Sequence, residues 1–177
     1  MPSLWFVLAA PLVAQGPEVP PPTEYEVKAV FLYHFAKFVE WPEVQRPNLE
    51  GAFVVTVLGA DPFGSLLEQT LEGKKVGGRS MTVRRAARPD DIGPCQILFI
   101  SDSEKERLPE ILQRLGGAAV LTVGEMDRFA ERGGVIRFRV ERSRIRLDIN
   151  LAVAERAHLK IRSELLKLAR VVGQAGG

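Results

Sequence analysis

Cysteine and histidine are scarce in this 177-residue chain, which has one cysteine and two histidines. A single thiol, Cys95, excludes an intrachain disulfide. Because Cys95 lies between Pro94 and the apolar segment 97–100, we expect it to be buried and unreactive rather than a nucleophile. His34 and His158 have no second ligand at metal spacing, so the sequence predicts neither a metal site nor a cofactor.

Signatures of enzymes and of nucleic-acid-binding proteins are also missing. No Gly-x-Ser-x-Gly nucleophile elbow occurs. Residues 73–79, GKKVGGR, look like a phosphate-binding loop, but they lack its Gly-Lys-Ser/Thr ending and precede a predicted strand, whereas that loop precedes a helix. The net charge is only +2, and basic residues are dense in only one cluster, at 137–146. We therefore expect no catalytic residue and no nucleic-acid partner.

The composition, with 46% apolar and 26% charged residues, is that of one globular domain. Residues 1–14 are apolar but fewer than the roughly 20 residues of a membrane-spanning helix, so they predict a secretory signal peptide. The segment has no basic residue before the apolar run and has Leu12 where a small residue is preferred, as if its basic end were truncated. The alternative is a frayed N-terminus of a cytosolic protein. Residues 15–22 predict a proline-rich spacer, and 23–173 a single domain.

Strand and helix patterns alternate along this domain. A capping box from Thr23 to Glu26 opens a predicted helix over 24–41, which Pro42 ends. Unbroken apolar runs within 52–59, 96–101 and 116–125 predict strands that are buried on both faces. The other predicted elements are a short helix ending at Leu71, a turn and strand over 73–86, a helix over 108–115 preceded by a capping box from Ser103 to Glu106, a short helix over 127–132, a β-hairpin over 135–150 that turns near 141–143 and has one arginine-rich face, a helix from Asn150 to about His158, and a helix over 164–172 capped by Ser163.

This order of elements predicts the fold class. We expect an α/β fold with a mostly parallel open sheet flanked by helices on both faces, and with a C-terminal antiparallel hairpin strand. In such sheets, ligands bind outside the carboxyl ends of the strands, where Asp61, Ser101 and Glu125 follow the three apolar runs. The same residue types are also favoured at helix caps and turns, so a structural role is the alternative.

The helix predicted over 24–41 is unusually rich in aromatic residues. Placing residues ~100° apart groups most of its aromatic residues on one face and leaves a narrow polar stripe. The face holds Val27, Val30, Phe31, His34, Phe35, Phe38 and Trp41; a second apolar flank holds Ala29, Leu32, Ala36 and Val39; the stripe holds Glu26, Tyr33, Lys37 and Glu40, with Lys28 isolated. Either the helix lies deep in the fold, or it contacts the sheet on one side and another protein on the other. We expect His34 to be a core or interface residue.

Several segments together resemble the YfiR family of secreted bacterial regulators. They are EYEVKAVFLYHFAKFVEWP, VTVLGADPFGSLLEQ, KVGGRSMTVRR, CQILFIS, VLTVGEMDRFAERGGVIRF and RLDINLAVAERAHLKIRSELLKLARVV, in this order. The resemblance spans about residues 24–172. It is most specific in the aromatic helix ending in Trp-Pro, in the Gly-Gly-Val-Ile-Arg-Phe strand and in the C-terminal segment.

The resemblance implies a periplasmic, non-enzymatic regulator that is often a homodimer. The best-known member type binds the periplasmic sensor region of an inner-membrane diguanylate cyclase and represses it, which lowers cyclic di-GMP and biofilm formation. Relatives are also associated with other membrane sensors, so the resemblance does not fix the partner. Nothing inserts into the membrane once the signal peptide is removed. Some members use disulfides, which the single Cys95 excludes here. The candidate partner-binding residues are Phe31, Tyr33, Phe38, Trp41 and Pro42. The alternative is a periplasmic small-molecule sensor or enzyme that uses Asp61, Ser101 and Glu125.

Overall fold

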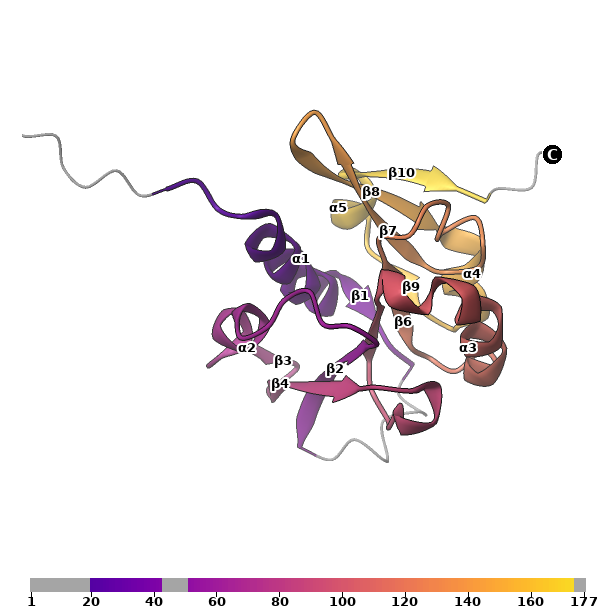
Figure 1. The fold of residues 1–177 in the computed structure, drawn as a ribbon, viewed down its shortest axis with the longest axis horizontal. Helices are drawn as coiled ribbons and strands as arrows, with labels where there is room; N and C mark the ends of the chain where they lie inside the picture. Colours follow the sequence, from indigo (N-terminus) through magenta and orange to yellow (C-terminus); the bar gives the residue numbers. More distant parts are fainter. Residues whose placement is uncertain (1–19, 43–50, 174–177) are drawn as a thin grey trace, which may run out of the picture.

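The apolar runs form the centre of an eight-stranded sheet (Figure 1). The computed structural model describes residues 20–42 and 51–173; the predicted signal peptide, 1–14, and most of the spacer, 15–22, lie outside these ranges. Across the sheet, the strands are β10 (Ala169–Val172), β8 (Arg144–Asn150), β7 (Ile136–Glu141), β6 (Leu121–Gly124), β5 (Ile97–Ile100), β2 (Ala52–Leu58), β4 (Arg79–Ala86) and β3 (Lys75–Val76).

Most neighbouring strands of the eight-stranded sheet are parallel; in the described part of the chain, its antiparallel pairs are β7–β8 and β3–β4. The predicted fold class and the predicted hairpin are therefore confirmed. The central strands are buried on both faces, as their unbroken apolar sequences predict: Phe53 and Phe99 belong to one core cluster, whereas Leu58 and Leu98 belong to another on the opposite face.

Helices cover the two faces. The first core cluster includes residues of α1 (Glu24–Phe38), α2 (Leu66–Leu71) and α5 (Ser163–Leu166), and the second includes residues of α3 (Leu108–Leu115). The remaining described elements are the helix α4 (Leu151–Arg156), the 3₁₀ helices η2 (Pro89–Asp91) and η3 (Asp102–Arg107), and a two-stranded sheet of β1 (Val39–Glu40) and β9 (Lys160–Ile161).

The first helix begins as predicted but ends earlier. Its capping box is present, because Glu26 N–H donates to the Thr23 hydroxyl at 3.3 Å while the Glu26 carboxylate accepts from Thr23 N–H. The helix does not reach Trp41. Val39 has extended backbone (φ −110°, ψ 139°), and β1 pairs antiparallel with β9. Trp41 therefore leaves the helical face on which the sequence pattern placed it.

The second predicted capping box, from Ser103 to Glu106, is wrong. The cap is Ser101, whose hydroxyl accepts a hydrogen bond from Ser103 N–H at the start of η3. Asn150 caps α4 as predicted, accepting from Val153 N–H at 3.1 Å, but α4 ends at Arg156, and His158 adopts a left-handed backbone (φ 57°) beyond it.

Residues 127–132 form successive turns instead of the predicted helix. The Phe129 ring folds back onto Gly124 and Gly134, and a β-carbon at Gly134 would lie 2.1 Å from that ring. Gly134 is thus required for the close packing of an aromatic ring.

The last predicted helix is also largely wrong. Only Ser163–Leu166 is helical, its N-cap is Arg162, and Ala169–Val172 forms β10, parallel to β8 at the edge of the sheet. Without β10, β8 would be an open edge; Arg170 holds the two strands together by donating to Asp148 at 3.0 and 2.9 Å.

Candidate functional site

Helix α1 has two apolar flanks in different environments. The inner flank is buried against the sheet and consists of Lys28, Ala29, Leu32, Phe35 and Ala36. The outer flank consists of Val27, Val30, Phe31, His34 and Phe38, none of which is fully buried. One side of the helix therefore meets the sheet and the other remains accessible, as the second interpretation of the sequence requires; contact of that side with another protein stays a prediction.

The outer flank forms one wall of an apolar groove. The opposite wall consists of α5 and of Leu168, which lies two residues beyond the end of α5. The groove has a volume of about 560 Å³. Its lining residues are Pro22, Glu26, Val27, Val30, Phe31, His34, Phe38, Glu164, Leu165 and Leu168. Val30 is 43% exposed and Leu168 is 63% exposed, so two large aliphatic side chains face solvent across the groove.

Aromatic stacking stiffens the α1 wall. The rings of His34 and Phe38 stack with 6.0 Å between centroids and 10° between planes. Phe31 packs against Phe35 and against Phe138 of β7, each at 6.0 Å. Because these side chains are held by their neighbours, a docking partner would meet a surface that is already ordered, which lowers the entropy lost on binding.

The apolar surface continues from the groove onto the hairpin. Phe138, Val140, Ile145 and Val171 point to the same face of the sheet, since side chains alternate along each strand and Val140 pairs with Ile145. Val140 is 52% exposed and Val171 is also exposed. All four large hydrophobic side chains that are exposed in the described ranges therefore belong either to the groove or to this adjoining face.

The rim of the groove carries negative charge. Hydrogen bonds from Thr23 lower the pKa of the Glu26 carboxyl, and the hydrogen bond from its own backbone amide lowers that of Glu164. Both carboxylates are therefore ionised at neutral pH. A partner that combined an apolar surface with basic residues would complement this groove.

The five predicted partner-binding residues do not form one site. Phe31 and Phe38 line the groove. Tyr33 lies under the ammonium groups of Lys37 and Lys74, each 5.5 Å from its ring centroid.

Trp41 packs edge-on against Phe53 at 5.2 Å and lines a separate hollow of about 490 Å³. Pro42 follows it and is half-buried. Sequence reasoning missed Leu168, because the helix predicted over 164–172 gave no reason to place it opposite α1.

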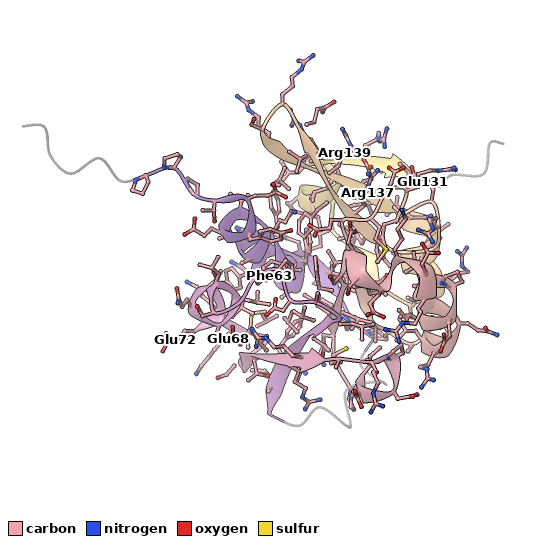
Figure 2. The ribbon with its side chains drawn as sticks, viewed as in Figure 1. Phe63, Glu68, Glu72, Glu131, Arg137 and Arg139 are labelled. Atoms are coloured by element: carbon pink, nitrogen blue, oxygen red, sulfur yellow. The ribbon has the colours of Figure 1, made fainter. Side chains whose placement is uncertain are left out.

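The three predicted ligand-binding residues have different partners within the fold. Asp61 accepts hydrogen bonds from Phe63 N–H at 2.8 Å and from Arg85 Nε at 2.7 Å. Ser101 caps η3. Glu125 accepts from the Tyr25 hydroxyl at 3.1 Å and pairs with Lys28. Figure 2 shows Phe63, whose ring packs on that of Tyr25 at 5.4 Å, beside α1. The structural alternative accounts for each of the three polar side chains.

The most unusual polar residue is Lys28, which the sequence pattern left isolated. It is only 2% exposed, and its ammonium contacts the carboxylates of Glu24 and Glu125 and lies 4.4 Å from the centre of the Tyr25 ring. Burial, followed by the charge of Glu125, raises the pKa of Tyr25 to about 12. This cluster fixes α1 to the end of β6 and so determines which flank of the helix faces outward.

Other kinds of site find no support in the residues described. Within 20–42 and 51–173, no group of three histidine, cysteine or acidic side chains could hold a metal ion. The helices in these same ranges are all too short or too polar to cross a membrane. Cys95 is buried, as predicted, and burial raises the pKa of its thiol to about 11.

Comparison with known proteins gives one family and one fold. Residues 25–170 match the model of a family described as YfiR/HmsC-like. No curated protein matches the chain. A crystal structure described as the ABC domain in complex with L-Trp from Streptococcus pneumonia is similar, with a TM-score of 0.54 and 11% identity over 79% of this chain. The match spans 59% of that other chain, and at this identity it shows a shared fold alone.

Proposed function

The chain belongs to the YfiR/HmsC-like family, and from that premise we propose that it represses an inner-membrane diguanylate cyclase by binding its periplasmic region in the groove between α1 and α5. The family is one of periplasmic regulators that act on inner-membrane sensor proteins and are not catalysts. Binding would hold the cyclase inactive and lower cyclic di-GMP. Export to the periplasm and assembly as a homodimer are parts of the same proposal.

The groove is the observation that carries this proposal. Its apolar lining is open to solvent at Val30 and Leu168, and neither residue is required by the core. Burying a large aliphatic side chain contributes about 1.5–3 kcal/mol, so covering the exposed fractions of these two would contribute roughly 1–2 kcal/mol for Leu168 and somewhat less for Val30. Such a pair at the centre of an interface accounts for a large share of a moderate affinity.

The partner segment that fits best is an amphipathic helix. The outer flank from Val27 to Phe38 covers about three helical turns, or roughly 17 Å at ~1.5 Å per residue, which suits the apolar stripe of a short helix. Basic residues beside that stripe would face Glu26 and Glu164. The chain would therefore prefer a cyclase whose periplasmic region has such basic residues over one that lacks them.

The test places glutamate in the groove. The chain would be co-expressed, in turn, with each inner-membrane diguanylate cyclase of the same cell that has a periplasmic domain, and cyclic di-GMP would be measured. Val30→Glu and Leu168→Glu should each abolish repression, because docking would bury an unpaired carboxylate. Gln113→Glu adds the same charge on an exposed position of α3, on the opposite face of the sheet, and should repress normally.

Two outcomes would contradict the proposal. One is full repression by both groove variants at normal protein levels. The other is the absence of any cyclase whose activity responds to the wild-type chain. Sedimentation velocity of the wild type and the variants tests the homodimer separately, and urea unfolding verifies that the two exposed positions leave the fold intact.

A further inference from the structure

The β7–β8 hairpin extends beyond the helices at the top of the molecule (Figure 1). Its register ends with Glu141 opposite Arg144, so Arg142 and Ser143 alone make the turn. Figure 2 shows Arg137 and Arg139 at the base of the hairpin. We call residues 140–146 the arginine tip; the groove and the core leave most of it uncovered.

Charge at the arginine tip is strongly unbalanced. Arg142, Arg144 and Arg146 accompany a single carboxylate, Glu141, which leaves two positive charges in seven residues. Glu141 pairs with Arg139 at 3.4 Å and with Arg146 at 3.7 Å. The exposed side chains of Arg142 and Arg144 make no hydrogen bond or ion pair with any residue in the described part of the chain.

The base of the hairpin differs from its tip, because its arginines are neutralised. Arg137, Arg139 and Arg170 surround Asp148, which is completely buried, and Arg137 also pairs with Asp127 at 2.9 Å. Structural stability therefore accounts for the arginines at the base. It does not account for Arg142 and Arg144, which stabilise no neighbouring group.

The turn itself is built from unsuitable residues. Arg142 (φ 50°) and Ser143 (φ 59°) both adopt the left-handed conformation, where asparagine and glycine are the favoured pair for a two-residue hairpin. Left-handed backbone is unfavourable for a residue with a side chain other than asparagine or aspartate. A residue kept at such a cost is a candidate for a role outside the fold.

An apolar side chain accompanies these charges. Val140 is 52% exposed and projects from the sheet face opposite the arginines, next to half-buried Ile145. A phospholipid surface has two layers that suit these side chains. Its phosphates bind guanidinium groups, and the hydrocarbon beneath them accepts an aliphatic side chain. Single-stranded nucleic acid would instead call for exposed aromatic rings, and the one aromatic residue of the hairpin, Phe138, is buried.

We infer that the arginine tip binds anionic phospholipid at a membrane surface, with the guanidinium groups of Arg142 and Arg144 on lipid phosphates and Val140 at the boundary of the acyl chains. This contact uses residues outside the lining of the groove and needs no protein partner. For a regulator of a membrane protein, it would confine the search for the partner to the membrane plane.

Vesicle flotation of the purified chain tests the inference directly. The wild type should bind vesicles of phosphatidylcholine mixed with phosphatidylglycerol, should not bind phosphatidylcholine alone, and should dissociate as salt is raised. Each basic residue near an anionic surface contributes about 1 kcal/mol, so Arg142→Ser with Arg144→Ser should lower the partition coefficient roughly 30-fold. Lys105→Ser with Arg156→Ser removes the same net charge from exposed positions elsewhere and should bind like the wild type.

A second variant separates lipid binding from folding. Arg142→Asn with Ser143→Gly supplies the favoured turn residues, so it should unfold at higher urea while its partition coefficient falls roughly fivefold from the loss of one charge. Three outcomes would overturn the inference: no binding of the wild type to anionic vesicles, unchanged binding by the Arg142/Arg144 variant, or equal losses in the control variant. Loss of cyclase repression in the Arg142/Arg144 variant, without vesicle binding by the wild type, would assign the tip to a protein interface and also refute lipid binding.

Discussion

Replacing Lys28 by methionine should destabilise the fold although the two side chains are similar in size. Removing one partner of a fully buried ion pair costs about 3–5 kcal/mol, because the remaining charge stays buried. Here Glu125 is 17% exposed and keeps the hydrogen bond from Tyr25, so we expect a smaller loss of about 2–3 kcal/mol. For a domain of this size, that corresponds to a decrease in Tm of roughly 5–10 °C.

Glu125→Gln should then rescue the Lys28→Met variant. With both charges removed, no buried carboxylate lacks a partner, and the double variant should unfold within about 1 kcal/mol of the wild type. Lys37→Met is the matched control, since Lys37 is exposed on the same helix, and should change the free energy of unfolding by less than about 0.5 kcal/mol. Urea titrations of the wild type, the Lys28→Met and Glu125→Gln single variants, the double variant and the Lys37→Met control measure these differences.

The same cluster predicts a pH dependence. The pKa of Tyr25 is raised from 10.0 to about 12 in the folded protein, so the unfolded chain loses this proton first as pH rises. The contribution of Tyr25 to stability is therefore complete below pH 10 and is lost between pH 10 and about 12. Tyr25→Phe should remove this part of the pH dependence of stability. It should also remove the ultraviolet absorbance change that accompanies ionisation of the Tyr25 hydroxyl near pH 12.

One set of results would refute this account of Lys28. If Lys28→Met cost less than about 0.5 kcal/mol, or if its effect simply added to that of Glu125→Gln, the two charges would not be coupled. Glu125 would then be available as a ligand-binding carboxylate, and the small-molecule alternative would gain support.

Further predictions concern the core and the hairpin. Trp41→Ala should cost about 2–3 kcal/mol in urea unfolding through lost packing on Phe53, and an unchanged midpoint would return Trp41 to the candidate partner surface. With a thiol pKa of about 11, Cys95 should react with a disulfide reagent at neutral pH only after denaturation; rapid labelling of the native protein would contradict its burial. Asp148→Asn should cost about 3 kcal/mol, whereas Asp127→Asn, at a 78% exposed position, should cost under about 0.5; equal effects would exclude a special role for burial.

Sequence patterns predict the centre of this fold well and its C-terminal end poorly. The strands around Val55, Phe99 and Val123 are apolar on both faces, which only a covered parallel sheet satisfies. The segment 164–172 has a helical pattern, yet four of its residues form β10, because β8 offers an unpaired edge that only the folded sheet contains. Local patterns do not describe such an edge.

The candidate site was predictable in part for the same reason. The helical wheel correctly identifies an excess of apolar surface on α1, and Phe31 and Phe38 do line the groove. It misplaces Trp41, because the helix ends at Phe38 where β1 pairs with a strand about 120 residues later in the chain. It also leaves Lys28 without a function, since the carboxylate of Glu125 that neutralises it lies 97 residues away.

The groove joins two segments that lie far apart in the sequence. One wall lies within residues 22–38 and the other within 164–168, and the hydrogen bond from Arg162 to Glu40, at 2.9 Å, spans 122 positions of sequence. A chain interrupted anywhere before Glu164 would lack one wall entirely, however well its central sheet had formed. If the groove is the docking site, partner binding requires residues 22–38 and 164–168 to be folded together, and a proteolytic cut that separated them would remove it.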